Sequence, residues 1–98
     1  MNITDVLDER GRVYGDFESV ASTAQQLKDR IKLSINPNPA YQNLSFNEKN
    51  AIRESLGMIC SKLARICHGD PMYKDNWDDI AGYALLISKM VEGDKNDI

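Results

Sequence analysis

The sequence lacks the long apolar runs and the long basic blocks that identify membrane proteins and many nucleic-acid-binding proteins. No run within the 98 residues approaches the roughly 18 apolar residues of a membrane span, and the polar N-terminus has no apolar signal core. The net charge is −3, and no block of lysine and arginine interrupts the chain. We therefore predict a cytoplasmic protein that does not cross a membrane. We also predict that it does not bind the phosphate backbone of a nucleic-acid polymer.

Cysteine and histidine are scarce, which limits redox, zinc and nucleophilic chemistry. Cys60 and Cys67 would lie about 10 Å apart on a helix, too far for a disulfide, so we predict free thiols in a reducing compartment. His68 is the single histidine, and these three side chains bind zinc only if carboxylates complete the site. The chain also lacks a Gly-x-Ser-x-Gly nucleophile motif and a phosphate-binding glycine-rich loop.

No stretch alternates apolar and polar residues for long, so the pattern predicts no β-strand. Apolar residues instead recur at helical spacing over residues 17–33, 46–68 and 75–92, and a shorter helix capped by Thr4 is predicted over residues 3–9. Residues 1–98 are therefore predicted to form a single all-α domain, a bundle of three main helices plus a short N-terminal helix. Because so short a chain buries a modest share of its surface, we expect oligomerisation to complete the bundle.

Residues that start or stop helices flank these segments. Asp16 precedes the first long segment and suits the positive end of its helix dipole. Ser45 and Glu48 have the spacing of a capping box at the start of the second segment, and Gly69 is placed to stop it. Residues 35–44 contain two prolines and are predicted to form a non-helical connection.

The third long segment is apolar around most of its circumference. Ile80 and Ala84 face one way, and Leu85 and Leu86 widen the apolar arc until little polar face is left. A helix of this kind is buried on several sides, which in so short a chain suggests a partner helix from another subunit. The helix is predicted to end at Gly93, with a polar tail after it.

Charged residues of opposite sign flank the turn between the second and third long segments. Lys62 and Arg65 lie near the end of one predicted helix, and Asp75, Asp78 and Asp79 open the next. One interpretation is a structural clasp, in which the basic groups pair with the carboxylates and the aspartates cap their helix. The other is a site for an anionic ligand, in which the basic pair receives a phosphate.

The carboxylates also suggest a magnesium site. Asp75 and Asp79 share a helix face, which Tyr83 continues one turn further, and two carboxylates so placed can share Mg²⁺. Glu54 lies about two turns before Lys62, roughly on the same face, and could complete the carboxylate set. Glu54, Asp75 and Asp79 are therefore the candidate metal ligands.

A second cluster precedes the first long helix, where glycines punctuate a predicted loop. Arg12 and Tyr14 lie there, followed by Asp16. One interpretation is a solvated loop in which Asp16 caps the next helix. The other is ligand contact, because arginine offers a bidentate fork for phosphate and tyrosine a flat stacking face.

Three short runs carry a resemblance to a known family: RVYGDF, KLARI, and DNWDDIAGYA after the turn. From about Arg10 to Met90 the chain resembles a family of small phage and prophage proteins. More distantly, it is similar to the all-α nucleoside triphosphate pyrophosphohydrolases, which include MazG-like and dimeric dUTPase-like proteins. The resemblance implies a helical bundle, usually oligomeric, that binds Mg²⁺ through a Glu-x-x-Glu on one helix and a Glu/Asp-x-x-Asp on the next. It also implies hydrolysis of nucleotides to monophosphate and pyrophosphate.

The acidic motifs of that superfamily match this sequence only in part. The second motif is matched by Asp75 together with either Asp78 or Asp79. Glu54 stands where the first would begin, but the third and fourth residues after it are Gly57 and Met58. Half of the metal site is thus missing, although nucleotide binding through a basic pair needs no metal.

These observations predict a phage or prophage accessory protein that binds a nucleotide or a related phosphorylated ligand. If it is a Mg²⁺-dependent pyrophosphohydrolase, Asp79 and Glu54 would be the catalytic residues, and metal-activated water would attack a phosphoanhydride. The alternatives are a non-enzymatic protein-interaction module and a nucleotide sponge that binds without turnover. The candidate ligand-binding residues are Arg12, Tyr14, Lys62, Arg65 and Tyr83.

Overall fold

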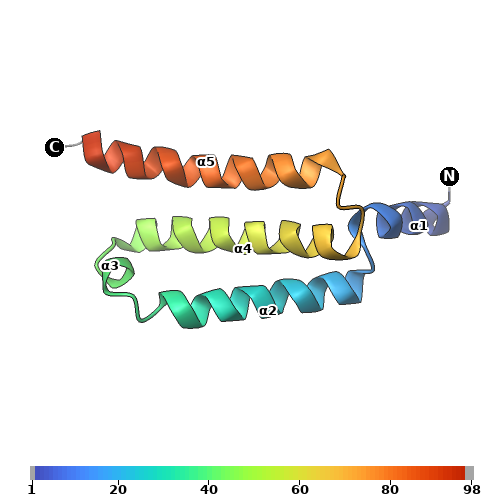
Figure 1. The fold of residues 1–98 in the computed structure, drawn as a ribbon, viewed down its shortest axis with the longest axis horizontal. Helices are drawn as coiled ribbons and strands as arrows, with labels where there is room; N and C mark the ends of the chain where they lie inside the picture. Colours follow the sequence, from blue (N-terminus) through green and yellow to red (C-terminus); the bar gives the residue numbers. More distant parts are fainter. Residues whose placement is uncertain (1, 97–98) are drawn as a thin grey trace.

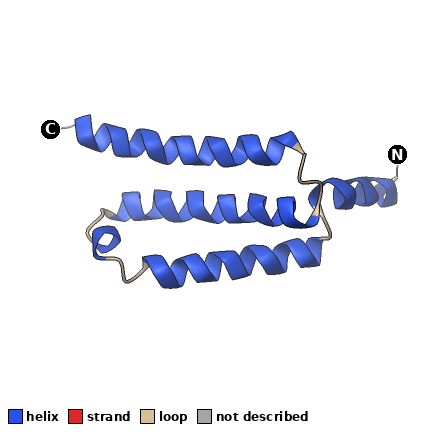
Figure 2. Ribbon diagram, in the orientation of Figure 1, coloured by secondary structure: helices blue, strands red, loops and turns tan. Residues whose placement is uncertain are grey.

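The computed structural model describes residues 2–96, which are helical except for short turns (Figure 2). The helices are α1 (Ile3–Tyr14), α2 (Phe17–Ile35), α3 (Pro39–Gln42), α4 (Phe46–His68) and α5 (Lys74–Asn96). No strand occurs within residues 2–96, so the all-α prediction is confirmed. The predicted polar tail is helical up to Asn96, and its last two residues lie outside the described range.

Three long helices lie side by side, with α4 between α2 and α5 and packed against both (Figure 1). The short helix α3 lies where α2 connects to α4, and α1 projects from the opposite end (Figure 1). The principal extents are 55 × 26 × 21 Å, and the radius of gyration is 16.3 Å. A compact domain of about 100 residues has a radius of gyration of about 13 Å, so this chain is an elongated layer.

Helix caps explain where two of the long helices begin. A carboxylate oxygen of Asp16 accepts a hydrogen bond from the backbone N–H of Ser19 at 3.1 Å, which starts α2 at Phe17 as predicted. At the start of α4, the Ser45 hydroxyl accepts from the Glu48 N–H at 3.1 Å, and the Glu48 carboxylate accepts from the Ser45 N–H at 2.9 Å. Both bonds of the predicted capping box are therefore present.

Two predictions about the shorter helices are wrong. Helix α1 does not end at residue 9 but continues through Gly11 to Tyr14, and its cap is Asn2 rather than Thr4. A glycine inside a helix costs only about 1 kcal/mol, which tertiary contacts at the end of α1 can offset. The predicted non-helical connection contains α3, because Pro39 occupies a first-turn position that needs no N–H donor.

The apolar core is thin. The buried apolar residues among those described are Ala24, Tyr41, Cys60 and Ala64, three of which are small. Several large apolar side chains are exposed instead, including Phe17 at 82% and Leu86 at 63%. No helix within residues 2–96 combines the length and apolar character needed to cross a bilayer.

Candidate functional site

The turn between α1 and α2 packs directly against the turn that follows α4. Gly15 has a φ of 93°, and a Cβ atom there would lie 2.7 Å from atoms of His68. A Cβ atom on Gly69 would lie 2.3 Å from the backbone oxygen of Val13. The Asp70 N–H donates to that same oxygen at 2.9 Å. Both glycines therefore permit a backbone contact that places the end of α1 beside the last turn of α4.

Two side-chain hydrogen bonds hold the helices that meet at this junction. Thr23 Oγ1 on α2 lies 2.7 Å from His68 Nε2 at the end of α4. The indole N–H of Trp77 donates to the backbone oxygen of Pro71 at 2.8 Å, which fixes the first turns of α5 against the preceding loop.

Tyr14 is the centre of a cationic and aromatic cluster at the junction. The guanidinium carbons of Arg65 and Arg10 lie 4.9 and 5.6 Å from the centroid of its ring, within the range of cation–π attraction. The Tyr73 ring meets it edge-on, with centroids 5.5 Å apart. A hydrogen bond with Tyr14 and the negative charge of Asp75 raise the pKa of Tyr73 to about 12. We call Arg10, Tyr14, Arg65 and Tyr73 the Tyr14 cluster.

Three members of the Tyr14 cluster line a groove of about 630 Å³ between α1, α2 and α4. Arg10 and Arg65 give it positive charge, together with Lys28 from α2. None of these three cations forms an ion pair with a described carboxylate. Asp16 also lines the groove, but its carboxylate is held by the cap of α2. The apolar wall of the groove consists of Leu7, Phe17, Val20 and Ala21.

The basic and acidic residues of the predicted clasp take part in three separate contacts. Lys62 Nζ lies 2.9 Å from a carboxylate oxygen of Asp79, which joins α4 to α5. Arg65 instead lies against Tyr14. Asp78 pairs with Lys74 on its own helix at 2.6 Å. The predicted clasp therefore forms through Lys62, while Arg65 belongs to the groove.

The candidate metal ligands do not meet within one chain. Lys62 and Asp79 set the register between the antiparallel helices α4 and α5. From this level, Glu54 lies about 12 Å along α4 in one direction, and Asp75 lies about 6 Å along α5 in the other. Consistently, no three His, Cys, Asp or Glu side chains in the described part of the chain form a group able to hold a metal ion. Magnesium binding stays a prediction from the sequence.

Two further sequence-predicted ligand residues lie away from the groove. Arg12 is exposed and pairs with Glu9 on the same helix. Tyr83 is half-buried on α5 and is not part of the groove lining. Of the five predicted ligand-binding residues, the structure thus brings Tyr14 and Arg65 together in the groove.

Sequence reasoning missed Arg10, Lys28 and Tyr73. Arg10 lies four residues before Tyr14, a spacing that places both on one helix face, but the predicted loop concealed this relation. Lys28 shares a predicted helix face with Ala24 and Ile31, and the apolar pattern of that face gives no sign of a ligand contact. Tyr73 lies in the turn, where helical periodicity says nothing about contacts.

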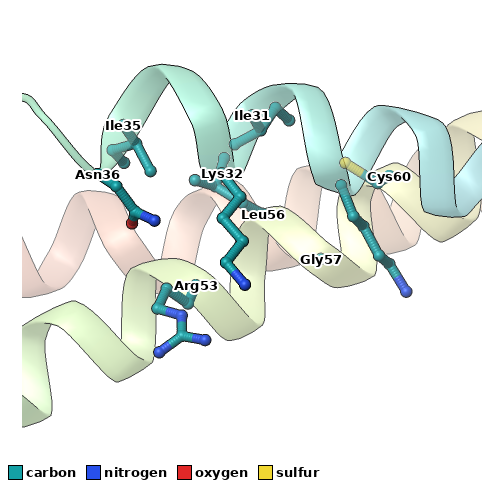
Figure 3. A pocket seen from close by; sticks show the side chains of 9 residues that line it. Ile31, Lys32, Ile35, Asn36, Arg53, Leu56, Gly57 and Cys60 are labelled. Atoms are coloured by element: carbon teal, nitrogen blue, oxygen red, sulfur yellow. The ribbon is translucent and has the colours of Figure 1, made fainter.

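A second, smaller cleft of about 170 Å³ lies between α2 and α4. Figure 3 shows Lys32 and Arg53 extending over it from the two helices, with the Cys60 sulfur at one end. Burial raises the pKa of the Cys60 thiol, although the nearby positive charge of Lys28 opposes this effect. Cys60 is therefore a neutral packing residue and a poor nucleophile.

Comparisons of the chain with protein-family models, curated proteins and solved structures find no match. The resemblance to small phage proteins and to MazG-like pyrophosphohydrolases stays a hypothesis, and the chemistry of the groove is the main support for a function.

Proposed function

We propose that this protein binds a nucleotide or a related phosphorylated ligand in the groove between α1, α2 and α4. The observation that supports this most is the position of Arg10 and Arg65 on the ring of Tyr14 at the groove wall. Guanidinium groups bind phosphate through paired, charge-assisted hydrogen bonds. Their contacts with Tyr14 restrict both side chains before a ligand arrives, which lowers the entropic cost of binding.

The remaining lining residues suit the rest of a nucleotide. Lys28 adds a third positive charge from α2. Phe17 is 82% exposed at the apolar wall and offers a flat face on which a base can stack. A groove of about 630 Å³ is within the usual range of small-molecule sites.

Binding without turnover is the form of this proposal that the geometry favours. Lys62 and Asp79 neutralise each other, and Glu54 lies more than two turns from that pair. The groove cations can hold phosphate oxygens without a metal. We therefore propose a nucleotide sponge, with Mg²⁺-dependent hydrolysis as the alternative. A phage accessory role and a cytoplasmic location remain predictions from the sequence.

Thermal unfolding with a panel of linear and cyclic nucleotides, each with and without Mg²⁺, tests the proposal. A ligand at 100 times its Kd stabilises by about 2.7 kcal/mol, which raises the Tm by several degrees in a domain of this size. We expect such a shift without Mg²⁺, and we expect Arg65→Met to abolish it. Arg30→Met is the matched control, because Arg30 is exposed on α2 and donates a hydrogen bond to Ser34 of the same helix.

Two outcomes would contradict the groove as the binding site: no shift with any nucleotide, or a shift that Arg65→Met retains. Pyrophosphate release distinguishes the sponge from the hydrolase. Release that requires both Mg²⁺ and Asp79, measured with Asp79→Asn, would favour the MazG-like alternative.

A protein-interaction module is the second candidate function. It is favoured by the thin core and by large apolar side chains left exposed on several helices. If no nucleotide stabilises the protein, this candidate becomes the stronger one.

A further inference from the structure

The chain exposes more surface than a compact monomer of its mass. Its accessible surface is 7200 Å², and its mass is 11.1 kDa. A compact protein of that mass exposes about 5,700 Å², which leaves an excess of about 1,500 Å². A standard protein–protein interface buries about 800 Å² on each partner. The excess is therefore large enough for a stable interface.

Helix α5 carries two neighbouring stripes of uncharged residues, one buried or half-buried and the other exposed. Its residues toward α4 are buried or half-buried and recur at helical spacing: Asn76, Ile80, Tyr83, Ile87 and Met90. A second stripe, turned by about 100°, is exposed and carries no charge. It consists of Trp77, Ala81, Ala84, Ser88 and Val91, which we call the open flank of α5. Because α4 is the neighbour of α5 in the layer, no helix of residues 2–96 covers this flank (Figure 1).

We propose that a second copy of this chain covers the open flank through an antiparallel pair of α5 helices centred on Ala84. Trp77 and Val91 lie equally far from Ala84 in the sequence, on either side. A two-fold axis at Ala84 therefore places Trp77 opposite the partner's Val91. The small side chains between them let the two helices approach closely, while the larger ones pack at both ends.

Charges beside the open flank favour the antiparallel direction. Lys74 and Glu92 lie eighteen residues apart, which is five helical turns, so they are on one line along α5. An antiparallel pair brings Lys74 near the partner's Glu92, whereas a parallel pair would leave the partner's Glu92 about five helical turns away along the helix axis. Lys74 already pairs with Asp78 on its own helix, and the partner's Glu92 would extend that pair into a network. This self-complementarity favours a second copy over an unrelated partner helix.

Sedimentation equilibrium over a range of protein concentrations tests the interface. We expect a monomer–dimer equilibrium that Ala84→Glu shifts to monomer, because two carboxylates would face each other at the axis. Ala84 is exposed within the chain, so helicity and Tm should change little. Lys89→Glu is the matched control, since it places the same side chain on the far side of α5 and should leave the dimer intact. A wild-type monomer at every concentration, or a dimer that Ala84→Glu does not affect, would overturn the proposal.

Disulfide trapping tests the register. In a Cys67→Ser background, where the remaining Cys60 is buried, Ala84→Cys should oxidise to a covalent dimer and Lys89→Cys should not. Trp77→Cys distinguishes the two directions, because the antiparallel pair places Trp77 opposite the partner's Val91 and a parallel pair places it opposite the partner's Trp77. A covalent dimer through Trp77→Cys would therefore show a parallel pair and refute the antiparallel one. These measurements use no nucleotide, so their outcome is independent of the proposed ligand.

Discussion

The ammonium group of Lys62 and the carboxylate of Asp79 join α4 to α5 at 2.9 Å, and the two side chains differ sharply in exposure. Lys62 is 13% exposed, whereas Asp79 is 48% exposed. The lysine therefore depends on its partner more than the aspartate does, because an isolated ammonium group is costly to keep away from water.

This asymmetry predicts unequal costs for the two single variants. Asp79→Asn leaves the Lys62 charge without its partner and should lower the free energy of unfolding by about 1–2 kcal/mol, between the values for surface pairs and buried pairs. Lys62→Met should cost less, because Asp79 stays hydrated. The double variant should cost less than the sum of the two. Urea unfolding measures all three, and strictly additive effects would show that the contact contributes nothing.

Gly69→Ala should destabilise the fold by about 1–3 kcal/mol, the usual cost of overpacking. The new Cβ would lie 2.3 Å from the Val13 backbone oxygen and 2.6 Å from the Tyr14 carbonyl carbon, and backbone atoms cannot rotate away. Gly82→Ala is the control, since nothing lies within 4 Å of its Cβ position in the interior of α5. That variant should stabilise by about 0.5–1 kcal/mol. Equal effects in thermal unfolding would exclude a tight contact at Gly69.

The Tyr14–Tyr73 contact predicts a loss of stability at alkaline pH. The pKa of Tyr73 is raised from 10 to about 12 in the folded chain, so folding favours the protonated phenol. Its contribution is fully present below pH 10 and is lost as the pH rises through about 12. Tyr73→Phe should remove this part of the pH dependence and also the last-ionising tyrosine in an ultraviolet titration. A wild-type titration in which every tyrosine ionises near pH 10 would contradict the contact.

The two cysteines should differ in reactivity. Cys67 is exposed, whereas Cys60 is buried and burial raises the pKa of its thiol. A thiol-specific reagent at neutral pH should therefore modify one cysteine rapidly in the native protein and the second only after unfolding. Cys67→Ser should remove the rapid phase. Rapid modification of both thiols would mean that the packing around Cys60 opens readily.

Helix signals that are local in sequence were the most informative part of the chain. The Asp16 cap and the Ser45–Glu48 capping box are both confirmed, because these bonds join residues three apart. The structure of the shorter helices was missed for a related reason. Glycine and proline usually mark the ends of helices. Here Gly11 is tolerated inside α1, and Pro39 starts α3.

The candidate site could be predicted only in part, because its members come from different helices. Tyr14 and Arg65 were both identified, but periodicity alone cannot show that they touch. Their contact depends on two turns that meet through Gly15 and Gly69. The burial of Asn76 is also invisible in the sequence: its side chain is 1% exposed, and its Nδ2 atom has no described hydrogen-bond partner.

The central position of α4 has a consequence for the order in which the helices of the folded chain open. Both α2 and α5 pack on α4, and each is its neighbour in the sequence apart from the single turn of α3. If α2 detaches, the pair of α4 and α5 can therefore persist, and if α5 detaches, the pair of α2 and α4 can persist. Amide protons of α4 should exchange with deuterium most slowly, and those of α1, which projects from the layer, most rapidly. The molecule would then open from its edges inward, with α4 as the last helix to lose its structure.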